Sequence, residues 1–571
     1  MKNKFTCLTF AFSCLVFSVI AQGSKKEIPK TTKNEEPKIL RKEIELDRKS
    51  DEFFVVPVGK EGIIVFNETK EKTAKGERAW SFKKLNTNLE ESWVKSISIG
   101  KNLDYEKFYQ DGLYTYILLV DGSSLKGAMA SAFSGDFTIV KVDPIEGKIT
   151  TASGEIPFNT TIADFKVTDD VAFFGGETMP TLNQVCVRTC LLQLTCMIPV
   201  CFGGGEYKRD ATLVTFNLKN AKQTIPSQNY KGSSFTTGLA IDTSNNTVLT
   251  VIGNKIDKKT TKTYLKEYSP NGELKRAIEV NPNGNNELID ASICKISDEE
   301  KLLIGTYSEP LAKQSFMMKV AQAMAPTTSS YAEGVYISKF VSDKQKFMKY
   351  YSFNDFKNFY GYLGKDMENK IEKKIKKQKA KGKTVDVNYA LLVHDIIVYN
   401  DQYIFLAEAY YKEYHTEYYT DAQGKQRSRR VFDGYRYTHA VVAGMDKEGK
   451  MLWDNCFPIW NILTMELKER VKVVVKNSKV VLVYNYGGDL TSKIIDGNKL
   501  ENYNSIAIET NYDGDKVKEN SGSDMFYWYD DYFLAFGYQK IKNKKTDVDN
   551  DGDKDIKKKR NVLYMNKIIF K

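Results

Sequence analysis

Short apolar runs separated by polar turns recur along nearly the whole chain. Runs this short, rich in β-branched and aromatic residues, predict strands, and strands this apolar are normally covered on both faces. Helical spacing is almost absent outside two inserts, so the chain is predicted to be all-β. The most apolar runs number eight: IIVF (63–66), YTYILLV (114–120), VAFF (171–174), TVLTVI (247–252), KLLIGTY (301–307), YIFLAEA (403–409), KVVLVY (479–484) and YFLAFGY (532–538).

Each apolar run occupies the same place in a repeating unit. The unit reads as a first strand, a tight polar turn, the apolar second strand, a variable hairpin, a third strand, a second polar turn and a fourth strand. The first turns fall at residues 59–62, 111–112, 169–170, 244–246, 298–299, 400–401, 477–478 and 530–531. Four-stranded antiparallel units repeated in this way predict a β-propeller, most simply one of eight blades.

The eighth unit has three strands before the chain stops. We expect Lys42–Asp47 (KEIELD) to supply its fourth strand from the other end of the chain, because this exchange closes the ring and removes an open sheet edge. Seven blades with an accessory hairpin is the alternative.

A resemblance supports this architecture. The stretch GKMLW, Gly449 to Trp453, follows Asp446 and resembles the Asp-turn-Gly-x-x-x-Trp signature of quinoprotein-type propeller repeats, and Trp93 after Asn88 echoes it. The longer stretch FDGYRYTHAVVAGMDKEGKMLWDN is similar to segments of uncharacterised exported propellers of gram-negative bacteria. The resemblance implies a blade pattern, and no bound quinone is expected.

The N-terminal residues of the chain indicate export. Residues 1–21 read as a cleaved signal peptide, with Lys2 and Lys4 before an apolar run too short to span a bilayer. A lipoprotein acylated at Cys14 is the alternative. Residues 22–39 have little to bury and are expected to be a flexible lead-in, and residues 40–571 a single propeller domain. Periplasm, cell surface or the outside medium is the expected location, and no membrane-spanning segment is predicted.

Large inserts interrupt the repeat. We expect them at residues 122–136, 177–206, 309–333, 355–388 and 410–437, all projecting from one face of the disc. Loops on a rigid scaffold are where binding residues concentrate, so this face is the predicted binding face. In the lysine-rich insert, Met367, Ile371 and Ile375 have the spacing of a short amphipathic helix, whose lysines either form a solvated face or contact an acidic lipid or polysaccharide.

The insert at 177–206 concentrates the cysteines of the chain. Four of them in sixteen residues of an exported protein predict two internal disulfides, with the connectivity open and a metal site as the alternative: Cys186, Cys190, Cys196 and Cys201. Apolar residues of this insert and the methionines of the 309–333 insert form a candidate binding patch: Leu191, Leu192, Met197, Ile198, Phe202, Met317 and Met318. The other mature cysteines, Cys294 and Cys456, read as buried apolar thiols.

The stretch DVDNDGDKD predicts a structural calcium loop. Its aspartates have the spacing of the oxygen ligands in such loops, and Gly552 permits the sharp turn, although Lys558 stands where a bidentate Glu is expected. The alternative is a soluble hairpin tip. The candidate ligands are Asp547, Asp549, Asp551, Asp553 and Asp555.

Catalytic motifs are scarce. Glu413, His415 and Glu417 share one side of a predicted strand, with His439 on the returning strand, and read either as a metal cluster or as an exposed polar arm. Acidic residues near the central channel also leave a glycosidase pair open. We therefore expect a non-catalytic binding or scaffold protein of the gram-negative envelope whose partner is an envelope protein or a glycan, and not a nucleic acid. The alternatives are a glycan-acting propeller enzyme and a carbohydrate-binding lectin.

Overall fold

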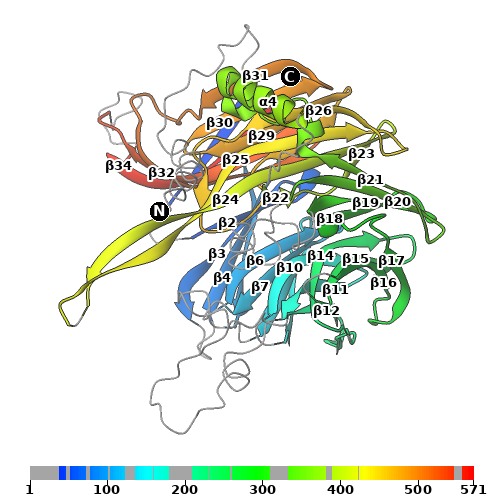
Figure 1. Ribbon diagram of the computed structural model, residues 1–571. Helices are drawn as coiled ribbons and strands as arrows, with labels where there is room; N and C mark the ends of the chain where they lie inside the picture. Colours follow the sequence, from blue (N-terminus) through cyan, green and yellow to red (C-terminus); the bar gives the residue numbers. More distant parts are fainter. Residues whose placement is uncertain are drawn as a thin grey trace.

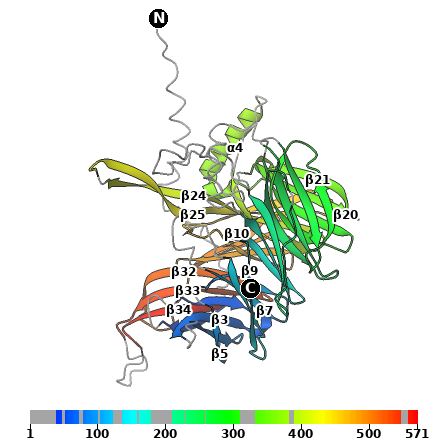
Figure 2. The same ribbon diagram turned by 90° about the horizontal axis from the view of Figure 1, so that it is seen from below.

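A computed structural model gives the fold of the chain. It describes residues 38–46, 52–72, 78–100, 103–121, 135–157, 160–178, 209–228, 230–257, 260–308, 332–380, 389–421, 423–545 and 556–570. These residues are almost entirely β-structure, arranged in eight separate antiparallel sheets. Figures 1 and 2 show the sheets grouped around a common middle, a propeller-like all-β fold.

The first four sheets follow one another along the chain, each with its strands in sequence order. Sheet 1 holds β2 (Phe54–Pro57), β3 (Ile63–Lys72), β4 (Arg78–Leu85) and β5 (Glu91–Ile99). Sheet 2 holds β6 (Leu103–Gln110), β7 (Thr115–Asp121), β8 (Asp136–Val142) and β9 (Ile149–Glu155). Sheet 3 holds β10 (Thr160–Thr168), β11 (Val171–Thr178), β12 (Asp210–Asn217) and β13 (Gln223–Thr224). Sheet 4 holds β14 (Ser233–Asp242), β15 (Thr247–Lys255), β16 (Thr261–Tyr268) and β17 (Leu274–Val280).

The other four sheets include the largest one and the one that joins the two chain ends. Sheet 5 holds β18 (Glu287–Lys295), β19 (Glu300–Ser308), β20 (Gly334–Val341) and β21 (Lys344–Ser352). Sheet 6 has six strands, β22 (Ala390–Val393), β23 (Ile397–Tyr399), β24 (Gln402–Thr420), β25 (Gln426–Met445), β26 (Met451–Pro458) and β27 (Leu463–Thr464). Sheet 7 holds β28 (Lys472–Lys476), β29 (Lys479–Tyr486), β30 (Asp489–Asp496) and β31 (Lys499–Ala507). Sheet 8 holds β32 (Lys516–Tyr529), β33 (Tyr532–Lys542), β34 (Lys559–Ile569) and the N-terminal β1 (Lys38–Glu45).

The apolar runs are the second strands, as the sequence predicts, and their alternate faces build the core. Eight apolar clusters each join two consecutive sheets, and the last of them joins sheet 8 to sheet 1. In β24, for example, Phe405 packs toward sheet 5 while Leu406 packs toward sheet 7. Each second strand therefore packs its sheet against both neighbouring sheets.

The tight turns use left-handed backbone conformations. Asp169 and Asp170 have φ of 47° and 59°, and Asn400 and Asp401 have φ of 44° and 62°. Successive residues with positive φ are typical of the two-residue hairpin turns that match strand twist, and Asn and Asp tolerate this region best. The positions of these turns agree with the sequence pattern.

Strand β1 pairs along its whole length with β34, from Lys38 opposite Ile569 to Glu45 opposite Val562. It begins before Lys42, where the sequence analysis places it, so residues 38 and 39 belong to a strand and not to the expected lead-in. Buried charges fasten it: Arg560, with a side chain 3% exposed, donates to Asp515 at 2.9 Å and to Glu43 of β1 at 3.3 Å.

Two features stand outside the regular sheets. Strands β24 and β25 run far beyond their neighbours as a two-stranded arm, which projects from the rest of the molecule in both views (Figures 1 and 2). Between sheets 5 and 6 lie the short helices η4 (Phe353–Asp355) and η5 (Gly361–Leu363) and the helix α4 (Lys365–Lys379). A third short helix, η1 (Gly59–Glu61), forms the first turn of sheet 1. The helix predicted from Met367, Ile371 and Ile375 is thus present as α4. Among the described residues, no helix is both long and apolar enough to cross a membrane.

The tryptophans of the quinoprotein-like pattern lie at equivalent places between sheets. Trp93 of β5 donates to the carbonyl of Pro144 at 3.3 Å and packs on Gly147 in sheet 2. Trp453 of β26 packs beside Gly497 in sheet 7 and donates to Gln402 at 3.0 Å. In both cases an outer-strand tryptophan docks on a glycine turn of the following sheet.

Candidate functional site

Many of the sites predicted from sequence fall where the structure gives no description. This applies to the calcium ligands, the clustered cysteines and the apolar patch: Asp547, Asp549, Asp551, Asp553, Asp555, Cys186, Cys190, Cys196, Cys201, Leu191, Leu192, Met197, Ile198, Phe202, Met317 and Met318 lie outside the described residues. Of the remaining cysteines, Cys456 is buried, and burial raises the pKa of its thiol to about 12, while Cys294 is half-buried.

The structure keeps Glu413, His415 and Glu417 on one face of β24, as the sequence predicts, and gives each side chain a separate partner. Glu413 pairs with Arg436 at 2.5 Å, His415 with Asp433 at 2.5 Å and Glu417 with Arg429 at 2.7 Å. His439 lies at the base of the arm, opposite Ala409. Each charged group on this face of the arm has its own partner, so the alternative of an exposed polar arm describes these residues and the metal alternative does not.

His439 belongs instead to a buried aromatic cluster. Its ring is fully buried and stacks on Tyr362 at 4.0 Å with an interplanar angle of 6°, while Phe359 and Tyr389 meet its edge. Burial lowers the pKa of His439 to about 3, so the imidazole is neutral near neutral pH. It packs η5 and the residue Phe359 before it against sheet 6.

A recurrent irregularity marks the first strands. The pairing with the second strand slips by an extra residue in β6, β10, β14 and β18, and β32 is interrupted in the same region, at Ser521–Asp524. In sheet 6 the first strand is split into β22 and β23 around His394 and Asp395. Bulges re-aim side chains and are frequent next to functional sites.

Acidic residues recur at these bulges. Asp164, Asp290 and Asp524 each follow the extra residue, and each accepts a 2.8 Å hydrogen bond from the backbone N–H of the next residue. Glu106 and Asp395 lie at the corresponding interruptions of sheets 2 and 6. The repeat therefore delivers carboxylates from five sheets.

The carboxylates meet cations from distant sheets. Lys166 of sheet 3 lies 3.7 Å from Asp395 of sheet 6, and Lys468, in the link to sheet 7, lies 2.8 Å from Asp524 of sheet 8. The aromatic rings of Phe108 in sheet 2 and Phe526 in sheet 8 lie 5.4 Å apart. First strands that are far apart in sequence thus converge on one central network, in which the side chain of Asp395 is 85% exposed.

The tightest part of this network surrounds Glu408. Its side chain is fully buried; Oε1 accepts from the backbone N–H groups of Arg470 and Val471, both at 2.8 Å, and lies 2.8 Å from Nε2 of His394. Burial opposes the charged form of His394, but the carboxylates of Glu469 and Glu408 outweigh burial, and the pKa of His394 is raised. This cluster ties the link before β28 to sheet 6.

Three central carboxyl groups have a raised pKa and ionise less readily than ordinary carboxyl groups. Burial raises the pKa of Asp290 to about 7, and it also raises the pKa of Glu106 and of Asp164. These groups can exchange a proton closer to neutral pH than an ordinary carboxyl group. Across the described part of the chain, no three His, Cys, Asp or Glu side chains gather closely enough to hold a metal ion.

The arm presents two chemically different faces. Beyond Tyr410 its strand β24 pairs with β25 alone, and residues directly opposite one another share a face. The paired face carries the three side-chain pairs of Glu413, His415 and Glu417. The ring face carries a row of aromatic side chains, namely Tyr410, Tyr414, Tyr418, Phe432 and Tyr435, and two cations, Lys412 and Arg430.

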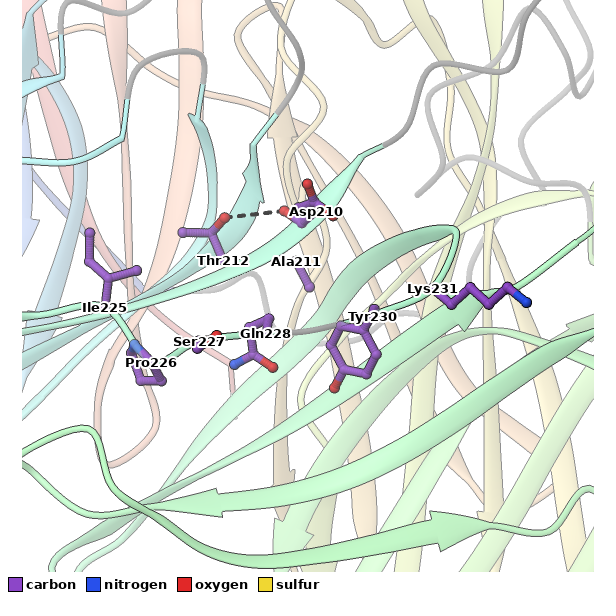
Figure 3. A pocket seen from close by; sticks show the side chains of 9 residues that line it. All are labelled: Asp210, Ala211, Thr212, Ile225, Pro226, Ser227, Gln228, Tyr230 and Lys231. Atoms are coloured by element: carbon purple, nitrogen blue, oxygen red, sulfur yellow. Dashed lines mark hydrogen bonds between the residues drawn. The ribbon is translucent and has the colours of Figure 1, made fainter.

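A pocket lies between sheets 3 and 4 (Figure 3). It has a volume of about 670 Å³ and is lined by Asp210, Ala211, Thr212, Ile225, Pro226, Ser227, Gln228, Tyr230 and Lys231. Strand β13 is only two residues long, and Pro226, which has no N–H to donate, follows it closely. The edge of β12 is therefore left without a full partner strand. The ammonium group of Lys266 lies over the ring of Tyr230 at 4.6 Å and donates to Gln228 at 3.1 Å.

The central acids were not among the residues singled out from the sequence. Their signal is an Asp in the middle of the first strand of several units, as in IADF (162–165), LIDA (288–291), HDII (394–397) and GSDM (522–525). The signal appears only when the units are aligned on their bulges, because the extra residue shifts the alternation of inward and outward positions.

Comparisons with known proteins give no match by sequence and only distant structural similarities. No protein-family profile matches the sequence, and no curated protein matches it. Among solved structures, the polysaccharide lyase Uly1 is similar with 9% identity and a TM-score of 0.34, over 83% of this chain and 90% of the other. The dihydro-heme d1 dehydrogenase NirN is similar with 12% identity and a TM-score of 0.31, over 80% and 73%.

The first of the matched solved structures is an ACO/RPE65 chimera, with 8% identity and a TM-score of 0.27 over 49% of this chain. The chain spans 56% of the length of that chimera and 59% of that of a Synechocystis apocarotenoid oxygenase.

Proposed function

We propose that this chain is an exported, non-catalytic binding or scaffold protein of the gram-negative cell envelope, and that it holds its partner through the projecting arm. The observation that carries the proposal is the ring face. Tyr414 is 37% exposed and Tyr418 is 76% exposed, on the outer part of the ribbon, where neither strand pairs with a third described strand. Tyrosine and arginine dominate binding energy at interfaces because they combine a large apolar body with polar groups. The propeller-like scaffold presents these side chains on an arm that projects far from the sheets.

The scaffold of this function is a closed propeller of eight blades, with β1 as the last strand of the eighth blade. The support is the series of apolar clusters, which pairs every sheet with the next and sheet 8 with sheet 1. A ring without open edges keeps an exported protein from aggregating through strand pairing. A rigid ring also fixes the direction in which the arm projects.

Capture from envelope extract tests the proposed function. One bait is the full mature chain, and the other lacks residues 412–434, which are replaced by a two-residue Asn-Gly turn. Equal melting temperatures of the two baits show that the sheets remain folded. We expect protein or glycan material that only the bait with the arm retains. If both baits retain the same material, the arm does not carry the function.

Two further elements of the proposal concern residues 177–206 and 547–555. We infer two disulfides among the four clustered cysteines and a structural calcium ion at the aspartate loop. Intact-mass measurement with and without reductant tests the disulfides. The calcium proposal predicts that a chelator lowers the melting temperature of the wild type and leaves the Asp547→Asn, Asp549→Asn, Asp551→Asn variant unchanged.

The second candidate function is a glycan-acting enzyme with its site in the central network. The observation in its favour is Asp290, whose pKa of about 7 suits proton transfer, at the bulge of β18 that corresponds to the bulge of β6 where Glu106, whose pKa is also raised, lies. This function predicts a hydrolytic or eliminating activity that Asp290→Asn abolishes and that removal of the arm leaves in place.

A further inference from the structure

The arm separates its charges by face. On the paired face, the carboxylates of Glu413 and Glu417 and the imidazole of His415 each lie within 2.7 Å of an oppositely charged or polar partner. At the tip, Asp421 accepts from Arg427 at 2.8 Å. The charged side chains of this face are therefore already paired within the arm, and few of them are available to a charged ligand.

The ring face lacks that balance. Arg430 has its guanidinium group 4.6 Å from the centre of the Tyr414 ring, and no acidic side chain in the described part of the chain pairs with it. Lys412 has no acidic partner among the described residues either, and burial, together with the nearby charge of Arg209, lowers its pKa. A positive charge that its own protein leaves uncompensated and partly desolvated favours an anion from outside.

The aromatic side chains give this face its shape. The rings of Tyr414 and Phe432 lie 5.4 Å apart, those of Phe432 and Tyr435 5.2 Å apart, and those of Tyr435 and Tyr410 5.7 Å apart. This row continues outward to Tyr418. Arg430 lies opposite Thr416, between Tyr414 and Tyr418 on the same face, so the outer half reads ring, cation, ring.

The order of groups restricts the ligand. Aromatic faces pack on flat apolar surfaces, such as the C–H-bearing face of a sugar ring, and an arginine meets a carboxylate with two parallel hydrogen bonds. A second copy of this chain fits poorly, because the chain carries a net charge of +11 and the ring face would meet its own cations. The ligand must combine ring faces with negative charge along one polymer.

We propose that the ring face of the arm binds an acidic polysaccharide, with sugar rings packed on Tyr414 and Tyr418 and their carboxylates or sulfates held by Arg430 and Lys412. This inference rests on the proposed binding function and names the ligand class of its arm. The export expected for the chain places it among envelope glycans and not among nucleic acids.

Matched variants on the two faces test the inference. Tyr418 and Arg430 lie on the ring face, while Tyr419 and Arg429, one residue away in each strand, lie on the paired face. The test variant is Tyr418→Ala with Arg430→Ala, and the control variant is Tyr419→Ala with Arg429→Ala. Binding of polygalacturonate and of heparin to the full mature chain is measured by titration calorimetry at 0.05 M and 0.5 M salt.

We expect the wild type and the control variant to bind one or both polymers with affinities within twofold of each other, and the test variant to bind at least tenfold more weakly. High salt weakens binding because it screens the cations. Neutral dextran, poly-L-glutamate and single-stranded DNA are the comparison polymers, and each is expected to bind at least tenfold more weakly than the acidic polysaccharide.

Other outcomes overturn the inference. Equal loss in both variants would mean that face identity does not matter. Poly-L-glutamate or DNA binding as tightly as the polysaccharide would assign an acidic protein or a nucleic acid instead. Arm-dependent capture from envelope extract without any polysaccharide binding would overturn this inference and leave the proposed function standing, whereas absence of both would overturn both.

Discussion

Two glutamates of one strand, five residues apart, show how differently the centre and the arm use charge. Glu408 of β24 is fully buried and gathers two backbone N–H groups and His394 around one oxygen. Glu413 of the same strand has a side chain 32% exposed and meets only Arg436. Removing the carboxylate of Glu408 would leave its buried hydrogen-bond donors without an acceptor. If Glu413 loses Arg436, in contrast, water can hydrate its carboxylate.

The comparison teaches where function can reside in this chain. In the centre, opposite charges lie close together, as with Lys468 in the link to sheet 7 and the buried Asp524 of sheet 8, which are 2.8 Å apart. On the ring face of the arm, Arg430 and Lys412 remain without acidic partners among the described residues. Charge that stabilises the fold is paired, and charge left over is available to a ligand.

The largest effect is expected where a buried ion network also completes a sheet. A chain that starts at residue 47 lacks β1, so β34 has an open edge and Arg560 loses Glu43. Because breaking one buried pair costs about 3–5 kcal/mol, we expect a loss of at least about 5 kcal/mol in the free energy of unfolding. A chain that starts at residue 38 is the control and should match the mature protein in urea denaturation. Equal urea midpoints for the two truncated chains would show that β1 does not close the ring.

The second effect compares the two glutamates directly. Glu408→Ala strands the imidazolium of His394 and two backbone donors, and we expect a loss of about 3–5 kcal/mol in the free energy of unfolding. Glu413→Ala breaks one part-exposed pair and should cost less than about 1 kcal/mol. Chemical denaturation of the two variants gives both numbers. Similar losses would show that the arm is as integral to the fold as the centre.

The third effect is a pH dependence at His394. Its folded pKa is raised above the unfolded value, so charged His394 contributes stability that is fully present below about pH 6.5 and lost as the pH rises through the folded pKa. The neighbouring groups are Glu408, Glu469 and the opposing charge of Lys472. We expect the free energy of unfolding of the wild type to exceed that of His394→Gln by about 1 kcal/mol at pH 6. This difference should shrink toward alkaline pH. A difference that grows with pH would reverse the assigned sign.

Much of the fold follows from local pattern, because strands and tight turns depend on neighbouring residues. The apolar second strands, the left-handed turns at Asp169 and Asn400, the helix at 365–379 and the pairing of the N-terminal segment with the last unit are all visible in the sequence. The central acids are not, because a bulge inserts one residue and inverts the alternation on which a strand pattern rests. The separate partners of Glu413, His415 and Glu417 were equally hidden, since partners on the returning strand depend on register.

The smallest effect concerns the paired face of the arm. Glu417 and Arg429 are both exposed, and their side chains meet in water, where an ion pair gains little over the separately hydrated charges. Exchanging them, with Glu417→Arg and Arg429→Glu together, preserves the pair in reverse. We expect no measurable change in melting temperature and no change in polysaccharide binding, because the ring face is untouched. The single Arg429→Glu change places two carboxylates opposite each other at this position and should lower protection of the arm from proteolysis while the sheets keep their melting temperature. If the exchanged pair instead weakens binding as much as the ring-face variant does, the two faces are not independent, and the separation between structural and available charge on this arm fails.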